Sequence, residues 1–255
     1  MRPSTDIATL VTSIPESRER FPWPDHEYVR GWGIFGLPFD SGHYLALRVF
    51  PQNDFAPYVT LWHRTPEGEW SIYADAPRLD VACPRYYGSV CTRTELRDIE
   101  LQWTGPRSLH VSMPEPAVSL SVEITDNRVA RMMNRMGPRM PLWTWRWRGL
   151  LAMREMMASR LLGLGRIELR GRAPSGHWGT LMPKRMYFIE SAQATFEGED
   201  LGRPTHLDDV ATIGDVTLPA RGVLAVGQAA WKILDPAEYE HLRSITAPSK
   251  VSGVL

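Results

Sequence analysis

Alternation of apolar and polar residues is clearest between Asp98 and Thr125. The apolar positions of this stretch are Ile99, Leu101, Trp103, Leu109, Val111, Met113, Val118, Leu120, Val122 and Ile124. A period of two predicts strands with one buried and one solvent-exposed face. Turn residues divide the stretch twice, so we predict an antiparallel meander of three strands.

A predicted hairpin precedes the meander. Its strands are Tyr58–Arg64 and Glu69–Asp75, joined by a four-residue loop at positions 65–68. If Arg64 faces Glu69 across this loop, two mixed faces result. One face carries Tyr58, Thr60, Trp62, Arg64, Ser71 and Tyr73, and the other carries Val59, Leu61, His63, Trp70 and Ile72. Neither face is plainly solvated, which is typical of a barrel wall between a core and a lumen.

The pattern becomes helical between Asp126 and Gly165. Gly137-Pro138 and Pro141 interrupt it, so we expect two helices, at about 127–136 and 142–162, the second ending at Gly163. The Trp and Arg residues at 143–148 also alternate as in a strand. The second helix therefore begins either near position 142 or only near position 149.

These patterns predict a mainly β protein with antiparallel, barrel or calycin-like sheets and a helical insertion at about 127–163. We divide the chain into an N-terminal arm at 1–30, a first β block at 31–125, the insertion at 126–165, and a second β block at 166–255. The arm is predicted to hold a short helix near Asp6–Ser13. The second block holds strands at about 166–172, 185–196 and 216–233, then a short helix at 235–242 and a tail. Whether the strands form one barrel or two stays open.

Composition singles out the insertion. The 255-residue chain has no net charge, but the segment 126–165 carries eight Arg against two acids, a net +6 that the rest of the chain balances. The segment also holds seven of the eleven Met and three of the ten Trp. Three interpretations remain open: a core helix in which Met fills gaps, a lid that adapts to an apolar ligand, and an interfacial helix at an anionic membrane surface.

The totals exclude several classes of protein. A sequence pI near 7.1 argues against a nucleic-acid binder. No window reaches the roughly 18 apolar residues of a membrane span, and the N-terminus lacks the apolar core of a signal peptide. We therefore expect a soluble, cytoplasmic protein. Cys83 and Cys91 form either one disulfide or two free thiols.

One nucleotide-binding motif is present only in letters. The run from Gly31 to Gly36 reads GWGIFG and matches G-x-G-x-x-G. That motif needs a helix directly after it to face a pyrophosphate, whereas Pro38 and another strand follow here. We interpret the run as a glycine-rich strand that another backbone approaches closely. The sequence also lacks a P-loop, G-x-S-x-G, H-E-x-x-H and C-x-x-C, so we predict no cofactor.

Histidines are the candidates for proton transfer. His43 follows Asp40 in a tight turn, and the two form an acid–base pair if their side chains meet. The alternative is a turn that Asp40 caps. His63 lies on the predicted hairpin and is the second candidate. A metal site built from His43, His63 and His177 is a further alternative, but no spacing requires it, and we predict no metal.

Aromatic residues with one polar group suit an apolar pocket with few polar anchors. The candidate ligand-binding residues of the first block are Tyr44, Tyr58, Trp62 and Tyr73. Those of the insertion are Trp143, Trp147, Met153 and Met157. We expect the aromatic and polar face of the hairpin to line a cavity that it shares with the insertion. Ordinary aromatic packing within a sheet is the alternative.

Three features carry a resemblance to a known group. They are Gly31-Trp32-Gly33, the Ser-Gly-His tripeptide at 41–43 and again at 175–177, and the hairpin from Trp62 to Trp70. In these, the stretch from Gly31 to Ile233 resembles the tandem lipocalin-like proteins, which include carotenoid-hydratase-type enzymes. The resemblance implies a hydrophobic small molecule held in a β-lined cavity.

The function predicted from the sequence is binding of a hydrophobic small molecule, with hydration, isomerisation or cyclisation as the reaction if the protein is an enzyme. The alternative is a module that binds a membrane surface or a protein partner through the basic insertion.

Overall fold

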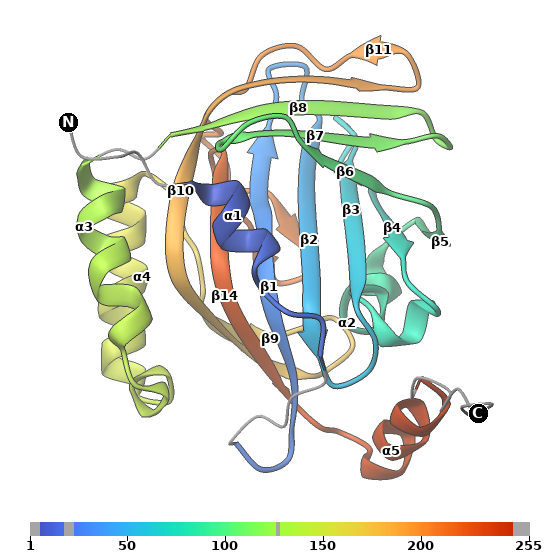
Figure 1. Ribbon diagram of the computed structural model, residues 1–255, viewed down its shortest axis with the longest axis vertical. Coiled ribbons are helices and arrows are strands. Elements are labelled where there is room, and N and C mark those ends of the chain that lie inside the picture. The colour runs from blue at the N-terminus through green and yellow to red at the C-terminus, as the bar shows by residue number, and fades with distance from the viewer. Residues whose placement is uncertain (1–5, 18–22, 126–127, 247–255) are drawn as a thin grey trace, which may run out of the picture.

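The structure, a computed structural model, describes residues 6–17, 23–125 and 128–246, with the backbone alone at 128 and 129. The chain is mainly β, as predicted, and its largest sheet curls into a half-barrel (Figure 1). The strands are β1 (His26–Pro38), β2 (Tyr44–Asn53), β3 (Tyr58–Arg64), β4 (Trp70–Asp75), β5 (Arg93–Leu96), β6 (Glu100–Trp103), β7 (Ser108–Met113), β8 (Val118–Thr125), β9 (Arg170–Arg172), β10 (Trp178–Phe196), β11 (Glu199–Asp200), β12 (Thr212–Ile213), β13 (Val216–Thr217) and β14 (Val223–Lys232). The α-helices are α1 (Ile7–Thr12), α2 (Pro84–Tyr87), α3 (Arg128–Met136), α4 (Arg148–Leu162) and α5 (Pro236–Ile245). The 3-10 turns are η1 (Leu79–Val81), η2 (Gly88–Val90), η3 (Gly137–Arg139) and η4 (Leu142–Trp145).

One sheet joins the two predicted β blocks. Its strands follow the order β5-β4-β3-β2-β1-β14-β10-β8-β7-β6, and β9 and β11 also pair with β10. All these pairs are antiparallel except β4 with β5. The first strand, β1, pairs with the last, β14, and β10 pairs with β14 along its first part and with β8 along its second.

The predicted meander is confirmed. β6, β7 and β8 pair in order, and the apolar positions of β7 and β8 are buried while the residues between them are partly or fully exposed. In Figure 1, β7 and β8 run across the top, above β1, β2 and β3. The local alternation of apolar and polar residues was sufficient to predict this meander, because one of its faces is exposed to water.

The predicted register of the hairpin β3–β4 is wrong by one residue. Arg64 pairs with Trp70, not with Glu69. The cause is the turn: Thr65 N–H donates to Glu69 O at 3.0 Å, and Gly68 takes a positive φ of 98°. A three-residue loop with a glycine of this conformation forms a bulge that shifts the pairing. Because side chains alternate, Trp70 and Ile72 join the face of Trp62, and Tyr73 lies on the opposite face.

The sheet has two different faces, which we name by one residue each. The Leu47 face carries Leu45, Leu47, Leu61 and Tyr73, and the meander and α1 pack against it. The Trp62 face carries Tyr44, Trp62, Trp70 and Trp231, and α2 and the segment around β12 and β13 pack against it. Both faces are buried, which explains why the sequence of the hairpin shows no solvated side.

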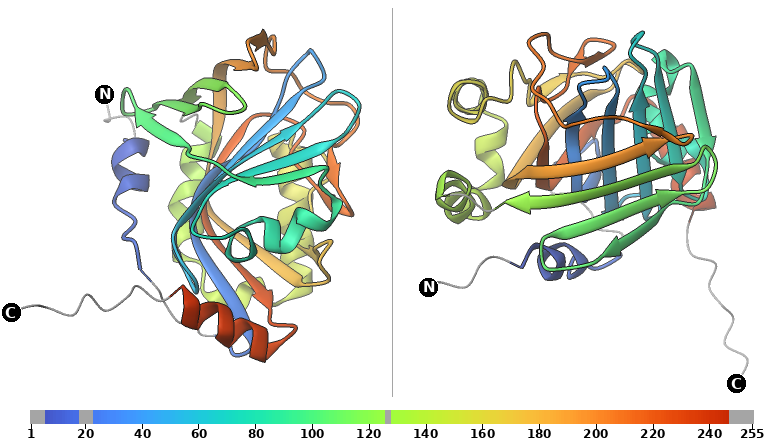
Figure 2. Two further views of the ribbon diagram at one scale, coloured as in Figure 1. Left: turned by 90° about the vertical axis from the view of Figure 1, so that its right-hand side faces the viewer. Right: turned by 90° about the horizontal axis from the view of Figure 1, so that it is seen from above.

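The insertion forms two helices beside the sheet, as predicted (Figure 2, right). α4 begins at Arg148, which selects the later of the two predicted starts, and ends at Gly163 in the left-handed conformation with φ of 62°. Asn134 anchors α3 to β10: its Nδ2 donates to Met186 O at 2.9 Å, and its Oδ1 accepts from Met186 N at 2.7 Å. The side chain thereby satisfies backbone groups of β10 that no strand reaches.

The structure also answers the questions about the cysteines and about membrane-spanning helices. Cys83 and Cys91 are free thiols, the second of the alternatives. Among the described residues, no helix combines the length and the apolar character needed to cross a membrane.

Candidate functional site

A cavity of about 180 Å³ lies between the Trp62 face and the insertion. The sheet contributes Arg48, Phe50, Trp62 and Trp231 to its lining. The insertion contributes Met133, Met140, Trp145, Arg154 and Ala158. The segments before β9 and around β13 supply further apolar side chains, including Leu164, Ile167, Leu169, Val216 and Leu218. The lining is therefore mostly apolar, as in typical small-molecule sites.

Small residues of β1 and β14 leave this space open. Gly31 pairs with Gly227, and Ala225 and Ala229 flank the latter on β14. A Cβ at Gly31 would lie 1.9 Å from Val49 O, and one at Gly227 would lie 2.4 Å from Met182 O. The expectation that the glycine-rich strand meets another backbone closely is thus confirmed, and these positions cannot carry side chains that fill the cavity.

The buried ring of Trp145 connects the insertion to the sheet. Its side chain is 1 % exposed, and two cations lie over its ring, Arg154 Cζ at 4.0 Å and Lys184 Nζ at 5.3 Å. Lys184 Nζ also donates to Met140 O at 2.8 Å. This wall of the cavity is consequently fixed to β10, although the methionines beside it can adapt their shape.

Tyr87 of α2 and Cys83, the N-cap residue of that helix, close the cavity from another side. The Tyr87 ring lies 4.9 Å from that of Trp62, between centroids. Burial raises the pKa of the Cys83 thiol and that of the Tyr87 hydroxyl above their ordinary values. Both groups therefore stay protonated at neutral pH and can act as weak donors, not as nucleophiles or bases.

Arg48 brings a positive charge to the cavity. Its side chain is 5 % exposed and donates to the carbonyls of Ile34 at 2.7 Å, Leu47 at 3.1 Å and Phe35 at 3.3 Å. It also lies 3.9 Å from the ring centroid of Phe35 and 5.0 Å from that of Trp62. Burial lowers the pKa of this guanidinium.

No carboxylate among the described residues forms an ion pair with Arg48. A buried cation without an anionic partner is costly, and the carbonyls of the β-bulge near Ile34 compensate it only in part. Arg48 therefore combines a structural role at this bulge with an unneutralised charge at the cavity wall.

Three further polar atoms at the cavity lack partners. Trp145 Nε1, Thr217 Oγ1 and Gln228 Oε1 are buried, and none of them makes a hydrogen bond with the described residues. Folded proteins leave few such groups, because each costs roughly 1–3 kcal/mol when unsatisfied. The three residues belong to the lining, but these atoms are enclosed by protein atoms, so Arg48 is the polar group that we consider as an anchor for a ligand.

The structure brings some predicted ligand-binding residues to this site and not others. Trp62 lines the cavity. Tyr44 and Tyr58 lie next to it: Tyr44 Oη donates to the lining residue Pro219 at 2.8 Å, and Tyr58 Oη lies 3.9 Å from Cys83 Sγ. Tyr73 lies on the opposite face of the sheet. In the insertion, Trp143, Trp147 and Met153 are exposed, and Met157, which is partly buried, is not among the lining residues.

The candidate histidines meet each other away from the cavity. His43 Nδ1 lies 2.8 Å from His63 Nε2, and the His63 ring stacks on Phe196 at 3.8 Å. Alternation places His63 on the Leu47 face. Asp40 accepts from Arg203 N at 2.9 Å and makes no described hydrogen bond with His43. A catalytic role for these three residues stays a prediction. Among the described residues, no group of three or more candidate ligands is arranged to hold a metal.

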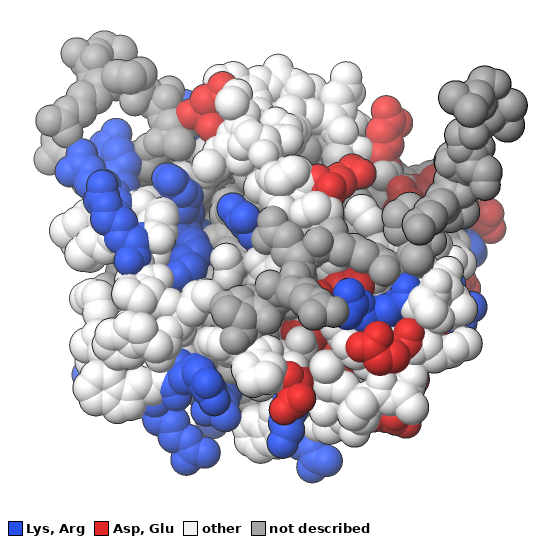
Figure 3. Space-filling view, turned by 60° about the horizontal axis from the view of Figure 1, so that its bottom comes forward, with Lys and Arg blue, Asp and Glu red and all other residues white. Residues whose placement is uncertain are grey.

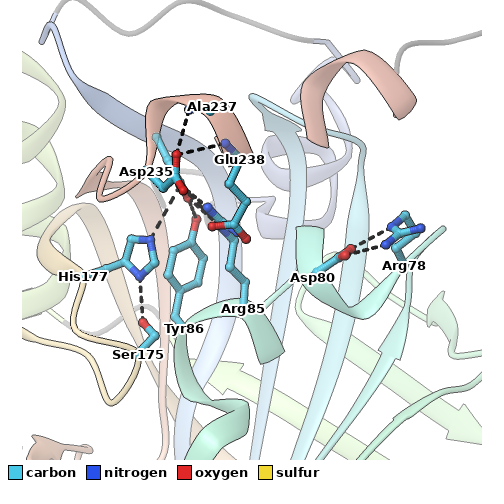
Figure 4. A network of polar contacts seen from close by, with 10 residues as sticks. Arg78, Asp80, Arg85, Tyr86, Ser175, His177, Asp235, Ala237 and Glu238 are labelled. Atoms are coloured by element: carbon cyan, nitrogen blue, oxygen red, sulfur yellow. Dashed lines mark hydrogen bonds and ion pairs between the residues drawn. The ribbon is translucent and has the colours of Figure 1, made fainter. Parts of the chain in front are cut away.

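A second polar cluster includes two residues of α2, Arg85 and Tyr86 (Figure 4). Glu27, 1 % exposed, pairs with Arg85 Nη2 at 2.7 Å and accepts from Tyr86 Oη at 2.5 Å. His177 Nδ1 lies 2.8 Å from Ser175 Oγ, and His177 Nε2 lies 3.8 Å from Glu27.

The order Ser, His, Glu in this cluster resembles a nucleophilic triad, but the geometry favours a structural role. Arg85 and Tyr86 already bind the carboxylate, and burial lowers the pKa of His177. Arg85 also pairs with Glu238 of α5 at 3.0 Å. The cluster therefore ties β1, α2, the turn at 173–177 and α5 together.

Sequence reasoning missed most of the polar groups of the cavity. Arg48 had a usable signal: it occupies one of the alternate positions of β2 whose other members, Tyr44, Ala46 and Phe50, are apolar or aromatic. A charged residue at a buried position of a strand is unusual and therefore indicates a candidate site, as a histidine does. Thr217 and Gln228 gave no signal, because nothing local predicts what β13 and β14 face.

Comparison with known proteins adds no assignment. The chain matches no protein-family model, and neither a curated protein nor a solved structure is detectably similar to it. The candidate site therefore rests on its own geometry.

Proposed function

We propose that the protein binds a small, mostly apolar molecule with one carboxylate or similar acceptor group in the cavity between the Trp62 face and the insertion. One observation carries the proposal: the buried guanidinium of Arg48, which forms no ion pair with a carboxylate of the described residues, lies at the wall of a mostly apolar cavity. Apolar walls supply affinity, and the few polar groups fix orientation.

The cavity limits the size of this ligand. An apolar cavity of about 150 Å³ accommodates benzene in another protein, and the volume here is about 180 Å³. A single substituted ring or a short branched chain therefore suits the space. The resemblance to lipocalin-like proteins favours the same class of ligand, and classification of the half-barrel as calycin-like belongs to this proposal.

Binding is the core of the proposal, and a reaction is a separate question. Hydration, isomerisation or cyclisation needs a group that moves a proton at the ligand. Glu168 lines the cavity, and its carboxylate pairs with Arg166 at 3.0 Å. It is the residue to substitute first if turnover of any bound molecule is found.

Calorimetry with a matched pair of probes tests the proposal. Para-isopropylbenzoate should bind at one saturable site, and the uncharged para-isopropylbenzamide should bind there more weakly. Ala158→Leu, which fills the cavity from α4, should abolish binding of both probes. Ala152→Leu adds the same side chain on the exposed side of the same helix and should leave binding unchanged. Equal binding by the two variants, or none by the wild type, contradicts the proposal.

A further inference from the structure

The end of the insertion that joins its two helices presents a second, outward surface. We name the segment from Met136 to Arg148 the tip. Its exposed side chains are two prolines, Pro138 and Pro141, together with Met136, Arg139, Trp143, Arg146, Trp147 and Arg148. The tip contains no Asp or Glu. In Figure 1 the tip forms the lower end of the pair α3 and α4.

Exposure of this kind is concentrated on the insertion. Of the twelve large hydrophobic side chains that are exposed among the described residues, seven lie between Met132 and Leu161. Trp143 is 63 % exposed and Trp147 60 % exposed. Burying such side chains is favourable, so a soluble protein seldom exposes them together without a partner.

The charged side chains of the tip itself are all arginines. Figure 3 shows Lys and Arg side chains on the left, where the insertion lies, and most Asp and Glu side chains elsewhere. Glu155, the one acid of α4, is half-buried and accepts from Leu169 N at 2.7 Å. The other end of α4 differs: His206 lies 3.1 Å from Gly163 O there, and the exposed Asp208 and Asp209 follow in the same loop. The tip is thus the acid-free end.

We propose that the tip docks onto the surface of an anionic lipid bilayer. Indole rings favour the boundary between hydrocarbon and headgroups, and arginines bind the phosphates beside them. Met136 adds aliphatic area that a nucleic acid does not use, because bases stack on rings. The inner side of the same tip, through Met140 and Trp145, is a wall of the cavity. Docking rests on the exposed surface alone and holds with or without a ligand.

Flotation with vesicles tests this inference in the full chain. The protein should bind vesicles of phosphatidylcholine mixed with phosphatidylglycerol and should not bind phosphatidylcholine alone. High salt should weaken the binding, because it screens the arginines. Brominated phosphatidylglycerol should quench tryptophan fluorescence. Failure to bind the anionic vesicles, or stronger binding to an oligonucleotide than to them, overturns the proposal.

Matched variants locate the contact. The double change Trp143→Ser with Trp147→Ser should lower vesicle affinity by at least tenfold and remove the quenching, since each indole contributes to interfacial burial. Arg148→Gln should lower affinity for anionic vesicles by about fivefold. The controls Leu96→Ser and Arg93→Gln change exposed residues of β5 and should have no effect. Equal losses in the controls would place the contact elsewhere.

The same double variant separates this proposal from the cavity proposal. Trp143 and Trp147 do not line the cavity, so their replacement should leave calorimetric binding of para-isopropylbenzoate unchanged. Ala158→Leu should leave vesicle binding unchanged. Loss of both activities in either variant contradicts the assignment of two independent surfaces.

Discussion

The two faces of the sheet are filled to different degrees. On the Leu47 face, Leu45, Leu47 and Leu61 are completely buried beneath the meander and α1. On the Trp62 face, large aromatic rings lie beside glycine and alanine residues, and a cavity remains. A chain selected only for stability would fill both faces. We attribute the stability of the fold mainly to the first face, and the proposed ligand binding uses the second.

Truncation of side chains should show the largest difference between the faces. Leu47→Ala and Leu120→Ala should each lower the free energy of unfolding by about 3–5 kcal/mol, because both side chains are tightly enclosed. Met133→Ala removes a partly buried side chain beside the existing cavity and should cost less than about 1.5 kcal/mol. Urea unfolding measures all three. A similar cost for Met133→Ala would mean that the wall of the cavity formed by the insertion is as important for stability as the Leu47 face.

The pH dependence of stability should report on His63 of the Leu47 face. Burial, followed by the neighbouring His43, lowers the pKa of His63 from 6.5 to about 4. The unfolded chain therefore takes up a proton between these values that the folded chain does not. The contribution of His63 is complete above pH 6.5 and is lost as the pH falls toward 4, by up to about 3 kcal/mol. His63→Phe, which keeps a ring against Phe196, should remove this loss.

Asp54 should act in the opposite direction over nearly the same pH range. Burial raises the pKa of its carboxyl from 3.8 to about 6, despite hydrogen bonds from Tyr239 and Tyr28. The folded chain binds this proton more tightly, so the group favours folding at low pH and loses that effect as the pH rises to 6. Asp54 thus offsets part of the loss from His63, and Asp54→Asn should steepen the loss of stability on acidification. A wild-type curve that matches that of His63→Phe would refute the assignment to His63.

Arg48 allows the two roles of the Trp62 face to be separated. Arg48→Gln keeps a donor for the bulge carbonyls but removes the charge, and should lower affinity for para-isopropylbenzoate by about tenfold, near the 1.5–3 kcal/mol of a charged hydrogen bond. Binding of the amide probe should change little. Arg48→Lys should retain most of the preference for the carboxylate. Arg154→Gln is the matched control, and a loss in that variant instead would move the anchor to the insertion. Calorimetry measures each case.

The smallest effect is expected on the wet side of the meander. Ser119→Ala should change the free energy of unfolding by no more than about 0.5 kcal/mol, because Ser119 stands between the buried positions of β8 and faces away from the core. Thermal unfolding provides the measurement. A cost comparable with that of Leu120→Ala would show that the meander is covered on both sides.

Elements with strong local patterns were predictable, and their partners were not. The meander and the two insertion helices follow from periodicity and from prolines at 138 and 141. The register of β3–β4 depended on the conformation of Gly68, which no apolar pattern encodes. β10 is longer than predicted because its bulge at Pro183–Arg185 tolerates a proline within a paired strand.

The candidate site was predictable only where aromatic residues revealed it. The sequence placed Trp62 at a cavity shared with the insertion, and the structure shows that residue there. It did not distinguish Trp145 from Trp143 and Trp147. A 3-10 turn over Leu142–Trp145 directs Trp145 inward and leaves the other two exposed. Orientation within so short an element depends on tertiary packing, not on spacing.

The pairing of β1 with β14 has a consequence for biosynthesis. β1 is made early, but its partner emerges from the ribosome only after almost all of the described chain. Until then β1 and β10 each expose a row of unpaired backbone groups, the kind of edge at which chains associate wrongly. Contacts so distant in sequence also slow folding. Newly made chains should therefore depend on chaperones until β14 inserts between these two strands and completes the sheet.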